Sequence, residues 1–131
     1  MDRGESLYPA DWLRVAEKDL ARVTRLLEIH DPEAAGLYLQ QAVEKFLKAF
    51  LLSKGWKLER IHDLDALLSA ASKHDPSLDR FRQACQRITE YYRVERYPLL
   101  RGGGVTEDEV RASFEQVQEL IQTLRVTAAA P

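Results

Sequence analysis

Apolar residues recur along most of the chain at steps of three and four, which is the spacing of one face of an α-helix. Three such stripes run through residues 13–27, 78–92 and 110–124. Between residues 33 and 54 the apolar positions cover more than one face, so this helix should be the most buried. No segment shows the sustained alternation of a β-strand between turn signals.

Local start and stop signals set the expected helix boundaries. Asp31 and Asp75 each precede a proline, the arrangement of an N-cap followed by the first helical position. Thr106 and Glu109 have the spacing of a capping box, and Gly55 suits a left-handed helix end. We therefore expect helices near residues 9–30, 33–54, 63–74, 76–94 and 106–127.

These segments predict an all-α protein, an antiparallel up-and-down helical bundle of four long helices plus one short helix. A chain of 131 residues is one domain's worth, and no linker divides it, so we expect a single domain over 1–131. Its core should span about residues 10–125, and residues 128–131 form a tail.

Composition narrows the function classes. The net charge of −2 argues against a protein that binds polyanions over its whole surface, but not against one local basic site. The single cysteine excludes an internal disulfide and a zinc site of several thiolates; it lies on an apolar stripe, so Cys85 should be a buried, inert thiol. We expect no metal and no cofactor. Without an apolar span or signal-peptide run, the expected location is the cytoplasm and no membrane is involved.

The segment from Arg80 to Arg101 holds six arginines and no lysine, whereas residues 102–131 are acidic. Arginine matches phosphate in a bidentate manner and stacks on bases, and aromatic rings beside it favour a phosphate-and-base site. The candidate ligand-binding residues are those at the end of this segment: Tyr92, Arg93, Arg96 and Tyr97. The alternative is a solvated arginine face with pairs along the helix.

A polar ridge in the expected second helix is the other candidate, formed by Gln41, Glu44, Lys45 and Lys48. We favour a solvated face, in which Glu44 and Lys48 form a supporting i, i+4 pair. The functional alternative is that the ridge lines a groove beside the segment 92–98. Catalytic residues stay unknown at this level.

Some apolar residues remain after one stripe per helix is assigned to a core: Trp12, Leu26, Tyr38 and Phe50. In so small a bundle this surplus favours a homodimer interface. The alternative is that these side chains thicken the core of the monomer.

Several of these residues together resemble one family. The second helix contains the run Gln40-Gln41-Ala42-Val43-Glu44-Lys45-Phe46-Leu47-Lys48, followed by His62-Asp63-Leu64 and later by Arg96-Tyr97-Pro98. As a set, they resemble the HEPN domain, named for higher eukaryotes and prokaryotes nucleotide-binding. The resemblance covers about residues 10–125.

The resemblance implies an antiparallel helical bundle, commonly a homodimer. Many members are encoded beside a minimal nucleotidyltransferase and act with it as a toxin–antitoxin pair, in which a tyrosine such as Tyr97 is a possible modification site. Some members are metal-independent ribonucleases with an Arg-x(4–6)-His motif in the C-terminal half, and others bind nucleotides. In this chain no histidine follows His74, and the formal match Arg25 to His30 lies in the first helix.

The function predicted from the sequence is therefore that of a HEPN-like component that binds a nucleotide or an RNA phosphate and acts with a minimal nucleotidyltransferase. The alternative is a metal-independent ribonuclease. It would be a degenerate one, since no general base is evident near the arginines. A non-catalytic protein-interaction module is a further alternative.

Overall fold

The computed structural model describes residues 5–96 and 104–130, with side chains on the last helical turn before the gap described as far as Tyr92. These residues form six α-helices and one 3₁₀ helix, and this part of the chain contains no strand. In chain order they are α1 (Pro9–Glu28), α2 (Pro32–Ser53), α3 (Leu64–Ser72), η1 (Pro76–Phe81), α4 (Arg82–Arg96), α5 (Glu107–Gln116) and α6 (Gln118–Ala129).

The predicted all-α bundle is confirmed, and so are most helix boundaries and their causes. Asp31 and Asp75 accept hydrogen bonds from the backbone N–H groups of Ala34 and Ser77, and Thr106 forms the expected capping box with Glu109. Gly55 follows the end of α2 with a φ of 84°. This is the left-handed conformation predicted for it.

Two boundaries differ from the prediction. The segment expected as one helix over 76–94 begins as a 3₁₀ turn, η1, before α4 starts. The helix expected over 106–127 is broken at Val117, whose φ of −99° and ψ of 6° leave the α region. Val117 is completely buried, and no glycine or proline lies there. The break is therefore set by tertiary packing, because it turns α6 so that its apolar face meets α2.

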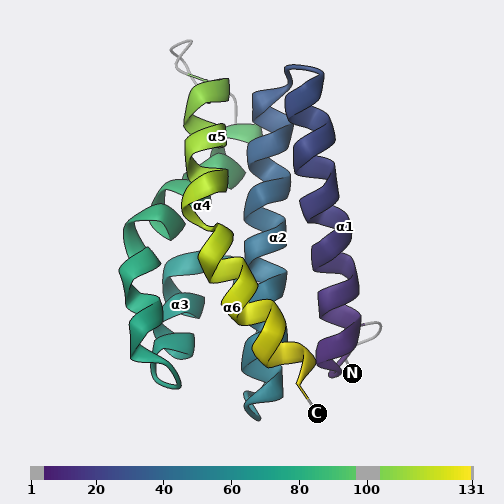
Figure 1. Ribbon diagram of the computed structural model, residues 1–131, viewed down its shortest axis with the longest axis vertical. Helices are drawn as coiled ribbons and strands as arrows, with labels where there is room; N and C mark the ends of the chain where they lie inside the picture. The colour runs from purple at the N-terminus through teal and green to yellow at the C-terminus, as the bar shows by residue number, and fades with distance from the viewer. Residues whose placement is uncertain (1–4, 97–103, 131) are drawn as a thin grey trace.

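α2 is the central element of the bundle (Figure 1). It packs against α1 on one side and α3 and α4 on the other, while α6 crosses it obliquely. Its position explains why its apolar residues cover more than one face, as the sequence predicted. The large side chains that are fully buried include Leu39, Phe46, Leu47, Phe50 and Leu51, all from α2.

α2 and α4 approach closely at Gly36. A Cβ atom at this position would lie 3.1 Å from both Cβ and Cγ of Tyr91, so a side chain here would crowd α4. The Tyr91 hydroxyl lies 2.8 Å from the Ser113 Oγ and donates to the Glu109 carbonyl at 3.3 Å, which ties α4 to α5. The close contact fixes where the later part of α4 lies along α2.

Of the surplus apolar residues, Phe50 is 2% exposed and belongs to the monomer core, which was the alternative explanation for it. Trp12, Leu26 and Tyr38 are half-buried. The homodimer stays a prediction. Within the described ranges, no helix combines the length and apolar character required to cross a bilayer.

Candidate functional site

The polar ridge of α2 is buried, contrary to the solvated face that we favoured. Glu44 and Lys48 are each 3% exposed, and Gln41 and Lys45 are half-buried. The i, i+4 pair itself is present, with 3.0 Å between the Lys48 Nζ and the Glu44 Oε2. A buried ion pair stabilises a fold little, because desolvation of the two charges offsets their attraction. The ridge is therefore not simply a solvated face of α2.

Glu44 is the centre of a hydrogen-bonded cluster. Its Oε1 accepts from Gln40 Nε2 at 3.0 Å and lies 3.1 Å from His62 Nδ1, while Lys48 donates to its Oε2. Gln40 is completely buried and also donates to the His62 carbonyl oxygen at 3.0 Å. These bonds hold the segment before α3 against α2. We call Gln40, Glu44, Lys48 and His62 the α2 polar cluster.

The His62 ring joins this cluster to α4. It lies parallel to the Tyr92 ring, with 5.9 Å between the ring centroids and 14° between the planes. The His62 side chain is 58% exposed, whereas the carboxylate that holds it is buried. The fold therefore brings Tyr92, one of the predicted ligand-binding residues, beside the ridge of α2.

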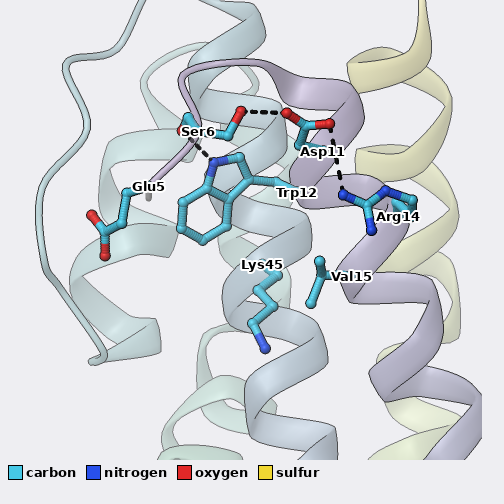
Figure 2. Close-up of a pocket in the computed structure, with 7 residues that line it drawn as sticks. All are labelled: Glu5, Ser6, Asp11, Trp12, Arg14, Val15 and Lys45. Carbon is cyan, nitrogen blue, oxygen red and sulfur yellow. Dashed lines mark hydrogen bonds and ion pairs between the residues drawn. The ribbon is translucent and has the colours of Figure 1, made fainter. Parts of the chain in front are cut away.

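Trp12 of α1 also contacts the cluster. The Lys48 Nζ lies 5.4 Å from the centroid of a Trp12 ring. This separation is within the range of a cation–π interaction. The Trp12 indole N–H donates to the Ser6 carbonyl at 2.7 Å, so the segment before α1 folds back over the indole. A pocket of about 220 Å³ lies beside the indole. Figure 2 shows the residues that line it, among them Lys45.

Lys45 and Gln41 are held by polar partners as well. Lys45 donates to Asp19 of α1, which is 2% exposed and also accepts from Arg22 at 2.7 Å. Gln41 donates to the Gln40 side-chain oxygen at 2.6 Å. All four ridge residues are thus positioned by hydrogen bonds, but only Glu44 and Lys48 belong to the α2 polar cluster.

A family model for the HEPN domain matches residues 9–127. The chain belongs to the HEPN family. The matched residues include every described helix up to residue 127. The helical bundle of the chain is the fold that the resemblance implied.

Two crystal structures have similar folds. TT1696 from Thermus thermophilus has a TM-score of 0.80 and 23% sequence identity, over 91% of this chain and 97% of that one. An archaeal HEPN homologue has a TM-score of 0.73 and 23% identity, over 92% of this chain and 98% of that one. A comparison with curated proteins gives no match.

The arginine-rich segment of this HEPN domain divides into two parts. Its first arginines have partners: Arg80 bonds Glu119 at 3.1 Å, Arg87 bonds Gln116 at 2.6 Å, and Arg82 bonds Asp65 at 2.8 Å. The hydrogen bonds that Arg82 donates to the carboxylates of Asp79 and Asp65 raise the pKa of its guanidinium above the usual value. Of the predicted ligand-binding residues, Arg93 and Arg96 have side chains outside the described part, and Tyr97 lies wholly outside it.

Cys85 of the HEPN domain is fully buried, as predicted. Burial raises the pKa of its thiol to about 12. The nucleophilic thiolate is therefore suppressed near neutral pH. A reaction at this sulfur is not supported.

Sequence reasoning missed Gln40 and His62 as members of a site. Gln40 precedes Glu44 by one helical turn, which was a usable signal for a bond between them. In the sequence, His62 was noted among the residues that resemble the HEPN domain, without a binding role of its own, and the N-cap of α3 is its neighbour Asp63. No local signal places His62 opposite Glu44, because 18 residues and a loop separate them.

Proposed function

We propose that this HEPN domain binds a nucleotide or an RNA phosphate where the end of α4 meets the α2 polar cluster. The observation that carries the proposal is the stacking of Tyr92 on His62, whose ring is held by the buried Glu44. This contact joins a positioned imidazole to the helix on which the arginines follow. A preorganised site of this kind reduces the entropy lost on binding.

In this proposal Arg93 and Arg96 hold phosphate oxygens, because the guanidinium group matches them in a bidentate manner. Tyr92 and Tyr97 stack on a base or donate hydrogen bonds. The ridge residues Gln41, Glu44, Lys45 and Lys48 line the neighbouring groove.

We also propose, from family membership, that the domain forms a homodimer in the cytoplasm and acts with a minimal nucleotidyltransferase as a toxin–antitoxin pair. Co-expression with the product of a neighbouring nucleotidyltransferase gene, followed by size-exclusion chromatography, tests both associations. A monomer that does not co-elute with this product contradicts both.

Replacement of Arg93 and Arg96 together by alanine tests the binding proposal. We expect the double variant to bind a labelled single-stranded RNA much more weakly. The dependence of its binding constant on salt concentration should also be less steep, by the amount expected for about two lost phosphate contacts. The matched control is Arg80→Ala with Arg87→Ala, which removes the same charge from the earlier part of the segment. Equal binding by the two double variants contradicts the proposal.

The position of His62 also favours the second candidate, a metal-independent ribonuclease. Because no histidine follows His74 in the sequence, a general base near α4 was not expected. In the fold, however, the His62 ring stacks on Tyr92 of α4. The test is RNA cleavage in the presence of a metal chelator. Cleavage by the wild type that His62→Gln abolishes supports this candidate with His62 as the base. Cleavage that survives the substitution contradicts the role of His62, and no cleavage by the wild type contradicts the candidate.

A further inference from the structure

We propose that His62 is itself an anion-binding residue, which contacts a phosphate oxygen through Nε2 only when its ring is protonated. The inference rests on the proposed function and deepens it, since it makes phosphate binding by this domain proton-linked. Four observations carry it: the orientation of the ring, the charge of the α2 polar cluster, the surrounding charged groups and the burial of the ion pair.

The orientation of the ring leaves one nitrogen for a ligand. Nδ1 faces both carboxylate oxygens of Glu44, at 3.1 and 3.3 Å. The ring is 58% exposed, so Nε2 is the nitrogen that a ligand from solvent can reach. Tyr92 fixes the ring plane by stacking, and Gln40 fixes the backbone through the His62 carbonyl. The imidazole is thus oriented before any ligand binds.

The proton then decides whether Nε2 attracts or repels phosphate. Beside a carboxylate, Nδ1 is the donor, so Nε2 of a neutral ring carries a lone pair. A phosphate oxygen also presents lone pairs and is repelled. In the protonated ring both nitrogens donate, and Nε2 can bond a phosphate oxygen.

Protonation of His62 also makes the net charge of the α2 polar cluster more positive, which favours a bound anion in the same way as the new donor at Nε2. The charges of Glu44 and Lys48 cancel across their 3.0 Å contact. With a neutral His62 the cluster has no net charge, and with a protonated His62 it has one positive charge. Salt screens partly buried charges less than exposed ones, so this single proton alters the attraction for an anion.

The other charged groups around His62 already have hydrogen-bond or ion-pair partners. In its own segment, Asp63 accepts the Asp65 backbone N–H at 2.9 Å, and Arg60 lies 4.0 Å from Glu5. On α1 and α2, Asp19 is paired with Lys45 and Arg22. α4 contributes the phenol of Tyr92, and its later side chains lie outside the described part. Among these neighbouring groups, His62 is the one imidazole, the side-chain type that serves as a proton-linked switch in proteins.

The burial of Glu44 and Lys48 supports a role beyond stability. An apolar pair of similar volume would serve the fold equally well or better. A carboxylate that orients an exposed imidazole is, in contrast, something an apolar pair cannot supply.

The test measures binding of a single-stranded 2′-O-methyl RNA with a tetramethylrhodamine label, which does not ionise in this window, between about pH 5.5 and about pH 8.5. Phosphodiesters do not ionise in this range, unlike a terminal phosphate with a second pKa near ~6. The 2′-O-methyl group prevents cleavage. We expect the affinity of the wild type to fall with rising pH, by up to about tenfold per pH unit, because the bond from Nε2 requires one bound proton.

His62→Gln retains an amide that can bond Glu44 but cannot become charged. We expect it to bind with a flat pH profile and with the weak affinity of the wild type at high pH. His30→Gln is the matched control, because His30 pairs with Glu107 at the junction of other helices, and it should retain the wild-type profile. If His62→Gln keeps the wild-type profile, the inference is wrong while the proposed function stands.

Glu44→Gln gives an independent readout, because it removes the carboxylate that faces Nδ1 and orients the His62 ring. We expect a weaker pH dependence than in the wild type, whereas Glu115→Gln on α5 changes the net charge equally and leaves the profile intact. Circular dichroism confirms that each variant is folded. If the wild type binds no RNA at any pH, the proposed function itself fails.

Discussion

α2 buries two faces of opposite chemistry, and their comparison separates stability from function in this domain. On one face Phe46, Leu47 and Phe50 are at most 2% exposed and lie in the apolar core. On the other, Glu44 and Lys48 are 3% exposed and bond each other. Exposure alone therefore does not distinguish the faces.

The two faces of α2 differ in how much their burial stabilises the fold. Burial of each large apolar side chain stabilises the fold by about 1.5–3 kcal/mol. Burial of the ion pair adds little, because desolvation offsets the attraction, yet loss of one partner leaves a charge unpaired. The apolar face explains why the bundle is stable, and the polar face is where a function that needs held charges is to be sought.

Removal of a large apolar side chain should have the largest effect. We expect Phe46→Ala to lower the free energy of unfolding by about 3–5 kcal/mol, through lost transfer energy and the cavity that it leaves. This cavity would lie beneath the Arg125 guanidinium, which packs over the Phe46 ring. Urea denaturation measures the loss. Phe114→Ala, at a half-buried site, is the control and should lose less.

The ion pair of Glu44 and Lys48 can be tested by comparing a single variant with a double variant, for which we expect different stabilities. Lys48→Met alone should destabilise by about 3 kcal/mol, since it leaves the Glu44 carboxylate buried without its cation. The double variant Glu44→Met with Lys48→Met should be within about 1 kcal/mol of the wild type, because an apolar pair can replace a buried ion pair. A double variant as unstable as the single one would show that the polar face stabilises the fold like the core.

The approach of α2 to α4 can be altered at Gly36. Ala is the better helix former by about 1 kcal/mol. Its Cβ, however, would lie 3.1 Å from Tyr91. We expect a net destabilisation of about 1–2 kcal/mol because crowding in a packed interior exceeds the helix gain. Gly36→Ser should lose at least as much, and a stabilised Gly36→Ala variant would show that the two helices separate freely.

The smallest effect on stability is expected at His62, because its ring is mostly exposed. His62→Gln should change the free energy of unfolding by no more than about 0.5 kcal/mol, as is usual for surface substitutions. A loss above about 2 kcal/mol in thermal or urea unfolding, which is typical of buried sites, would contradict the separation of the two faces. We expect the same variant to lose the proposed pH dependence of RNA binding, so one substitution tests the proposal without disturbing the fold.

Much of the fold could be predicted because its signals are local. The steps of three and four, the caps at Asp31 and Asp75, and the capping box at Thr106 each act within one or two turns of helix. The break at Val117 could not, because no residue there disfavours a helix and the turn is imposed by packing of α6 on α2.

The candidate site divides in the same way. The spacing of Glu44 and Lys48 correctly predicted their contact, because an i, i+4 pair depends only on the helix itself. Their burial could not be predicted, since Trp12 and His62 come from other elements. The order of the histidines along the chain likewise did not show that His62 lies against Tyr92, because chain order does not limit which groups meet in a folded bundle.

The sequence by itself thus determined the helices, the family and the residue types available for a phosphate site. Helical periodicity determines which side chains share a face. It is a local property of the chain and can therefore be predicted from the sequence. Only the tertiary structure decided that the polar face of α2 lies inside and that His62 meets both Glu44 and Tyr92. Burial and the pairing of distant groups depend on which elements pack together, and that choice belongs to the whole chain.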